Sequence, residues 1–148
     1  MQTSAIMLRI GKDAQMATGD LNDPGVILDV PSNSVWIRQE DPTNATPDPG
    51  DYFDDIWVSY TMFPATYTLY RCAFPAGVSP SACTASDEQI GKLVSIAAAA
   101  VIDDTLGVQD FYYEVTLTNR YDPAALRDTF DNPEYALTSR FSPISSSY

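Results

Sequence analysis

The sequence predicts an α+β fold in which an N-terminal α-helix packs on antiparallel β-sheet with long loops. Three observations favour this class: apolar residues recur at helical spacing near the N-terminus, later segments alternate between apolar and polar residues, and turn-forming residues separate those segments. A helix followed by a run of strands is typical of a helix packed on an antiparallel sheet. The length of 148 residues suits one domain spanning residues 1–148.

The first predicted element is a helix over residues 3–18. Its main apolar residues share one side at helical spacing: Ile6, Ile10, Ala14 and Ala17. Thr3 or Ser4 is placed to cap the helix, and Gly19 is placed to end it. Leu8 lies off the main stripe, so a second side of this helix also carries an apolar residue.

Strand signals dominate the rest of the chain. About six strands are predicted, over residues 26–30, 34–39, 56–62, 66–74, 109–119 and 134–145. The clearest is 109–119, where one face consists of Phe111, Tyr113, Val115 and Leu117. Alternation puts four tyrosines at inward positions, which favours core packing over a binding role: Tyr60, Tyr67, Tyr113 and Tyr135.

Two segments differ from this strand pattern. Residues 40–55 carry three prolines and six acids without periodicity, which indicates a loop. Residues 87–104 mix alanines, which favour helix, with β-branched residues, which favour strand. We predict a short helix over residues 87–104.

Charge and hydropathy exclude two kinds of partner. The formal net charge is −12, and there is no basic patch of the kind that phosphate contacts require. We therefore expect no direct nucleic-acid contact. No stretch reaches the roughly 18 apolar residues that indicate a membrane span.

The two cysteines, Cys72 and Cys83, lie in a stretch rich in Pro, Gly and Ser. Two thiols without a histidine lack the ligands of an ordinary zinc site. They are either free core cysteines or a disulfide, and we prefer a disulfide, which would contribute on the order of 2 to 3 kcal/mol at this loop length. A disulfide implies an oxidising compartment outside the cytoplasm.

The composition argues against catalysis. Histidine is absent, which removes Ser-His-Asp and Cys-His systems, and no Gly-rich phosphate loop occurs. The adjacent acids Asp54–Asp55 and Asp103–Asp104 have the residue types of a glycosidase pair. Solvated acids in turns are the better interpretation of both pairs, and we predict that the protein is not an enzyme.

The acidic loop offers candidate metal ligands. Asp41, Asp48, Asp51, Asp54 and Asp55 carry hard oxygen atoms of the kind that calcium binds, although they do not fit the EF-hand spacing. The alternative is that these acids are simply solvated and contribute charge and solubility. We expect no other cofactor.

The order of the elements resembles a known family. The segments concerned are "SAIMLRIGKDAQMATGD", the strand pair "IWVSYTM" and "YTLYRCAF", the apolar "KLVSIAAAAVID", then "DFYYEVTLTN" and the closing "EYALTSRFSPI". In this order they resemble the minor type IV pilins and the J-type minor pseudopilins of type II secretion. The resemblance covers most of the chain and rests on order and spacing.

The resemblance implies how the chain is built and where it works. Residues 1–19 would be the C-terminal half of a pilin helix and residues 20–148 a β-rich head. Members of the family carry a leader and a hydrophobic helix of about 20 residues, long enough for a bilayer. Membrane contact would therefore go through a helix absent from this chain, in a bacterial inner membrane before assembly, with the head in the periplasm or at the cell surface.

The resemblance also assigns roles to helix residues. Ile6 and Ile10 would face the domain's own sheet, whereas Leu8 would pack against neighbouring pilin or pseudopilin subunits. The alternative is an amphipathic helix that its own domain covers completely.

Two function classes follow. The first is a non-enzymatic structural subunit of a pilus or secretion filament, with other pilin subunits as partners. The second is a secreted or surface-anchored module that binds a ligand such as a carbohydrate through Trp57 or Trp36 and the acidic loop. An enzyme ranks third.

Overall fold

The computed structural model describes residues 2–20, 22–46, 51–103, 110–125 and 132–142. These ranges contain one α-helix, one short 3-10 helix and eight strands, two more than predicted. In chain order the elements are α1 (Thr3–Gln15), β1 (Val26–Asp29), β2 (Ser34–Gln39), η1 (Tyr52–Asp54), β3 (Ile56–Phe63), β4 (Thr68–Phe74), β5 (Glu88–Lys92), β6 (Ser95–Asp103), β7 (Asp110–Arg120) and β8 (Glu134–Phe141). Among them, no helix has the length and apolar character needed to cross a membrane.

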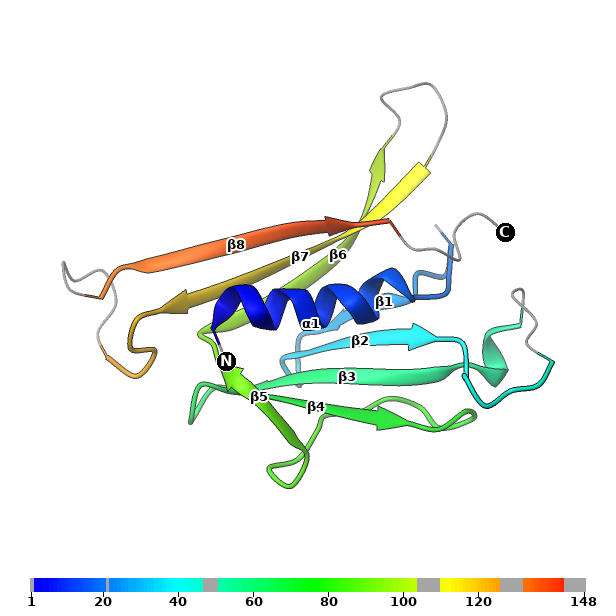
Figure 1. The fold of residues 1–148 in the computed structure, drawn as a ribbon, viewed down its shortest axis with the longest axis horizontal. Helices are drawn as coiled ribbons and strands as arrows, with labels where there is room; N and C mark the ends of the chain where they lie inside the picture. The colour runs from blue at the N-terminus through cyan, green and yellow to red at the C-terminus, as the bar shows by residue number, and fades with distance from the viewer. Residues whose placement is uncertain (1, 21, 47–50, 104–109, 126–131, 143–148) are drawn as a thin grey trace.

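The strands form two antiparallel sheets in which each strand pairs with the next along the chain. One sheet has five strands in the order β1-β2-β3-β4-β5, and the other has three in the order β6-β7-β8. Helix α1 lies lengthwise between the two sheets (Figure 1) and contacts strands of both. The predicted α+β arrangement of an N-terminal helix packed on antiparallel sheets is confirmed.

Helix α1 is shorter than predicted and is capped differently. It ends at Gln15 instead of residue 18, because the backbone N–H of Thr18 donates to the carbonyl of Arg38 on β2 (2.8 Å) and draws the chain onto the sheet edge. The predicted caps were wrong. Gln2 is the N-cap residue, without a side-chain cap hydrogen bond, and Thr3 Oγ1 lies 2.9 Å from the Tyr135 hydroxyl on β8.

Residues 88–103 form strands β5 and β6, so the helix predicted over residues 87–104 was wrong. Strand β6 pairs with β7 along its whole length, from Ser95 opposite Thr118 to Asp103 opposite Asp110. Burial alternates along its first half: Ile96 and Ala98 are buried while Ala97 and Ala99 are exposed. The helix preference of alanine amounts to less than about 1 kcal/mol per residue, and the long ladder with its buried face outweighs it. Residue 104 lies outside the described residues.

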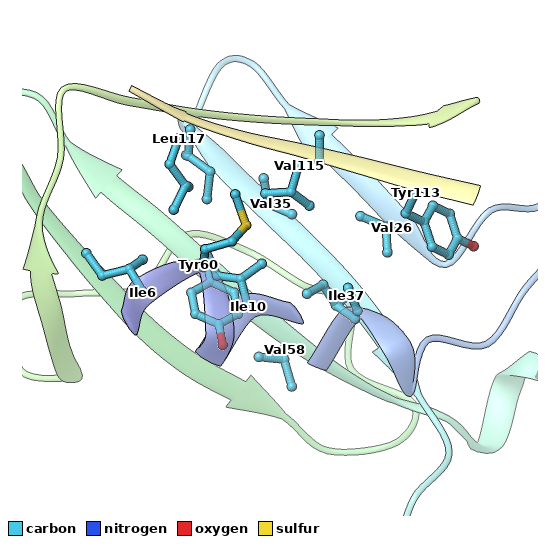
Figure 2. Packing of buried hydrophobic residues seen from close by; sticks show 14 of the residues in the cluster. Ile6, Ile10, Val26, Val35, Ile37, Val58, Tyr60, Tyr113, Val115 and Leu117 are labelled. Atoms are coloured by element: carbon cyan, nitrogen blue, oxygen red, sulfur yellow. The ribbon is translucent and has the colours of Figure 1, made fainter. Parts of the chain in front are cut away.

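The core lies between α1 and the inner faces of both sheets (Figure 2). Its largest fully buried side chains include Tyr60, Tyr113, Ile6, Ile10, Ile37, Leu69, Leu93 and Leu117. The inward positions predicted for Tyr60 and Tyr113 are confirmed. Tyr135 is 48% exposed, and Tyr67 is half-buried with a φ of 52° in the turn between β3 and β4, so the inward positions predicted for these two tyrosines were wrong.

An ionic contact joins the helix to the inner face of the five-stranded sheet. Asp13 of α1 accepts hydrogen bonds from Arg71 Nε (3.0 Å), from Gln39 Nε2 (3.1 Å) and from the Tyr60 hydroxyl. This polar cluster explains how an acid interrupts the apolar stripe of the helix, since its carboxylate reaches a partly buried arginine.

The outer face of the five-stranded sheet is covered near β3 by the segment that follows β4. The structure contains the disulfide between Cys72 of β4 and Cys83, with the two Cα atoms 5.7 Å apart. The backbone N–H of Cys83 donates to Thr61 Oγ1 (2.9 Å), and Thr61 Oγ1 also lies 2.8 Å from Ser34 Oγ. Ser34, Ser59 and Thr61 are consequently buried, although they point away from the helix.

Candidate functional site

A pocket of 340 Å³ opens beside η1, at the end of β3 where Trp57 lies. Side chains from β2, η1 and β3 line it together with residues of the segment after β4: Asp23, Arg38, Tyr52, Phe53, Asp55, Trp57 and Gly77–Pro80. We call it the Arg38 pocket. It combines several aromatic rings with buried charged groups, the combination that is typical of small-ligand sites.

Arg38 is the central side chain of this pocket. It lies on β2 opposite Trp57 of β3, and its guanidinium group is held on several sides. Nε donates to Thr18 Oγ1 (3.1 Å), and Nη1 and Nη2 donate to Asp23 Oδ1 (3.1 Å) and to the Asp23 carbonyl (2.9 Å). The guanidinium carbon also lies 3.9 Å from the centroid of the Tyr52 ring, close enough for a cation–π contact. Arg38 therefore holds the aromatic wall in place.

Asp55 forms the buried floor of the pocket, and its side chain is 0% exposed. Its Oδ2 accepts a hydrogen bond from Thr18 Oγ1 (2.6 Å) and lies 3.8 Å from Arg38 Nε. Burial raises the pKa of the Asp55 carboxyl, the hydrogen bond from Thr18 opposes that change, and the negative charge of Asp54 adds to it. The prediction that Asp54–Asp55 is a pair of solvated turn acids was wrong for Asp55.

A third carboxylate completes an acidic cluster next to the pocket. Carboxylate oxygens of Glu40, Asp54 and Asp55 lie within 4.8 Å of one another. We call these three residues the carboxylate cluster. Sequence reasoning left Glu40 out of the candidate ligands, although it lies in the same acidic loop. The pairing of β2 with β3 brings it to Asp54 and Asp55.

Two other predicted calcium ligands, Asp41 and Asp51, do not belong to this cluster. Asp51 accepts a hydrogen bond from the backbone N–H of Phe53 (3.0 Å) and so caps η1. Asp41 is half-buried and accepts from the Thr43 hydroxyl, which lowers the pKa of its carboxyl. Asp48 lies outside the described residues.

The aromatic rim of the pocket is unusually exposed. Phe53 is 91% exposed, although large apolar residues are normally buried. Trp57 lines the pocket. Trp36 stands two positions before Arg38 on β2 and does not line it. Of the two tryptophans predicted to bind a ligand, only Trp57 belongs to this pocket. The sequence signal that could have indicated this pocket is the stretch "DYFDD", in which aromatic and acidic residues are adjacent.

A larger pocket of 750 Å³ lies at the N-terminal end of α1. Its main polar groups already bond within the protein: Asn119 Nδ2 donates to Thr3 Oγ1 (2.9 Å), and Lys92 Nζ donates to Thr68 Oγ1 (2.9 Å). The Arg38 pocket differs in that three aromatic side chains surround a buried arginine and the fully buried carboxylate of Asp55. We therefore regard the Arg38 pocket as the better candidate site.

The three predicted subunit-packing residues lie on two different sides of α1, as the apolar stripe of the sequence predicts. Ile6 and Ile10 are fully buried, and Leu8 is 74% exposed. The exposed side of α1 carries Ser4, Leu8, Lys12 and Gln15, so Leu8 is its single large apolar residue. Met16, just after the helix, is also exposed.

Comparison with known proteins does not identify the chain: no family model, no curated protein and no solved structure matches it. The likeness to minor pilins therefore stays a prediction from the sequence. The helix face and the Arg38 pocket are therefore the features from which function can be inferred.

Proposed function

We propose that this domain is a non-enzymatic assembly subunit of a filament of the type IV pilus or type II secretion class. The observation that carries the proposal is the division of α1 into a sealed inner face and an outer face on which Leu8 is 74% exposed. Single exposed apolar residues are common on protein surfaces. A leucine on the outer side of a helix is well placed to pack against the helix of a second subunit.

The disulfide supports the location that this function requires. Disulfides persist in the periplasm and at cell surfaces, whereas cytosolic thiols are kept reduced. The Cys72–Cys83 bond thus favours a head that folds outside the cytoplasm of a bacterium. Its partners would be other pilin or pseudopilin subunits.

The test is a charge placed on the outer face of α1. Leu8→Glu, made in the full gene of the source organism, should remove the protein from the filaments sheared off the cells, because a desolvated carboxylate opposes helix packing. Val30→Glu is the matched control, since Val30 is a 69% exposed apolar residue in the turn between β1 and β2. Both variants should keep the thermal stability of the wild type. Wild-type amounts of Leu8→Glu in the filaments would contradict the proposal.

A second candidate function is ligand recognition by a secreted or surface-anchored module. The specific observation that favours it is the exposed ring of Phe53 next to Tyr52 and Trp57 in the Arg38 pocket. Flat aromatic faces suit the apolar faces of sugars, so the expected ligand is a carbohydrate. Release of the wild-type protein into the medium, with none in sheared filaments, would favour this function over the first.

A further inference from the structure

Three carboxylates converge at the point where β2 ends and η1 leads into β3. Glu40 directly follows β2, Asp54 is the last residue of η1, and Asp55 stands between η1 and β3. Their oxygens lie within 4.8 Å of one another. Like charges this close repel, so the folded protein needs something that offsets them.

The hydrogen bonds of two of these acids leave one oxygen atom each for a ligand. Asp54 Oδ2 accepts from Asn44 Nδ2 (2.7 Å), and Asp55 Oδ2 accepts from Thr18 Oγ1 (2.6 Å). The Oδ1 atoms of both residues are buried and accept no hydrogen bond from any described residue. A buried carboxylate oxygen without a donor costs free energy, and the side chain of Asp55 is fully buried.

Arg38 offsets this charge only in part. It lies 3.8 Å from Asp55 Oδ2, and its positive charge is shared with Asp23 at 3.1 Å. The single positive charge of Arg38 is therefore divided between Asp23 and Asp55, and Asp54 adds a further negative charge.

We propose that Glu40, Asp54 and Asp55 bind a divalent cation, with calcium as the expected ion. Calcium takes six to eight oxygen ligands at about 2.3–2.6 Å, so oxygens on opposite sides of the ion are about 4.6–5.2 Å apart. Magnesium holds its ligands at about 2.0–2.1 Å, and the corresponding separation is about 4.0–4.2 Å. The three oxygens lie within 4.8 Å of one another, close enough to share one ion. Calcium accepts such a set in flexible geometry, whereas magnesium demands a near-ideal octahedron. Water molecules would complete the coordination.

The cation would also fix the rim of the Arg38 pocket. Tyr52 and Phe53 belong to η1, whose last residue, Asp54, is one of the three ligands. Binding at the carboxylate cluster would tie η1 to the end of β2. This inference does not depend on whether the domain serves as a filament subunit or as a ligand-binding module.

The experiment uses the whole chain after treatment with a chelator. Calcium chloride at millimolar concentration should raise the melting temperature by several degrees, because an ion that binds only the folded state stabilises it. Isothermal titration calorimetry should give one site. Terbium should bind in place of calcium and show luminescence sensitised by the nearby Tyr52 and Trp57 rings. Magnesium should produce a smaller thermal shift.

Variants identify the ligands. Asp54→Asn and Glu40→Gln should each weaken calcium binding by about tenfold or more, since affinity follows the number of charged ligands. Asp51→Asn is the matched control, because Asp51 is exposed in the same loop and caps η1, and its calcium affinity should stay at the wild-type value. Circular dichroism confirms that each variant is folded.

Two results would overturn the proposal. One is the absence of both a thermal shift and binding heat in millimolar calcium. The other is an Asp54→Asn variant that is more stable than the wild type whether or not calcium is present, which would mean that Asp54 and Asp55 share a proton in place of a cation.

Discussion

The outer faces of the two sheets carry similar polar residues in opposite environments. On the three-stranded sheet, the Thr116 and Thr138 hydroxyls form an exposed hydrogen bond (3.0 Å), and Glu114 of the central strand β7 accepts from Arg140 of β8 (3.2 Å). On the five-stranded sheet, the row of Ser34, Ser59 and Thr61 is buried under Cys83. The residue types do not decide which face is exposed to water. The segment after β4 covers the outer face of the five-stranded sheet, and the disulfide anchors that segment.

A covered polar row has to satisfy its own hydrogen bonds. Thr61 Oγ1 lies 2.8 Å from Ser34 Oγ and 3.2 Å from Ser59 Oγ, and it accepts from the Cys83 N–H. An exposed polar row has water as an alternative partner, so each of its bonds contributes less. The two faces should consequently differ in how they respond to substitution.

The largest expected effect comes from removing the anchor of the cover. Cys72→Ala combined with Cys83→Ala should lower the free energy of unfolding by about 3 kcal/mol, the entropy of a loop closed over this short span. Urea denaturation followed by circular dichroism measures it. The reduced wild-type protein should show a similar loss, and an unchanged midpoint in both samples would mean that the bond contributes nothing to the cover.

A smaller effect should separate the two faces directly. Thr61→Val removes the acceptor of the buried Cys83 N–H and should cost about 1–3 kcal/mol. Thr116→Val makes the same chemical change on the exposed face and should stay within about 0.5 kcal/mol of the wild type. Equal losses in the two urea midpoints would show that the cover does not distinguish the sheets.

The sequence predicted the strands whose two faces differ in polarity. Alternation marked residues 56–62 and 109–119, and these became β3 and β7. It failed over residues 88–103, because the alanines of β6 are small enough to sit on either face of a sheet. There the burial pattern depends on pairing with β7, which local propensity does not encode.

The candidate site was less predictable than the fold. The cysteine pair was readable because two thiols close in the chain have few alternatives. Arg38, Asp23 and Asp55 meet only after β2 pairs with β3 and the chain after α1 returns to β2. No spacing in the sequence encodes that meeting. In the sequence Phe53 is one more aromatic residue, and only the structure shows that it is 91% exposed.

The smallest expected effect is the dependence of stability on the ionisation of two buried tyrosines, one from each sheet, which does not act at neutral pH. Burial raises the pKa of both the Tyr60 and the Tyr113 hydroxyls. The negative charge of Asp13 raises the pKa of Tyr60 further. The hydrogen bond from the Gly25 N–H lowers the pKa of Tyr113 and so opposes the effect of burial. An exposed or unfolded tyrosine ionises near pH 10. Because the folded protein keeps these protons longer than the unfolded chain does, this contribution to stability is complete below about pH 10 and is lost as the pH rises further.

Tyrosinate absorbance near 295 nm after a jump to alkaline pH measures this linkage. Exposed tyrosines should ionise at once, and Tyr60 and Tyr113 only as the protein unfolds, which gives a delayed phase. Tyr60→Phe and Tyr113→Phe should each reduce that phase and make stability fall less steeply above pH 10. If all tyrosines of the wild type ionise in the dead time while circular dichroism still reports folded protein, the inner faces of the two sheets admit hydroxide, and their burial would not distinguish them from the exposed face around Thr116.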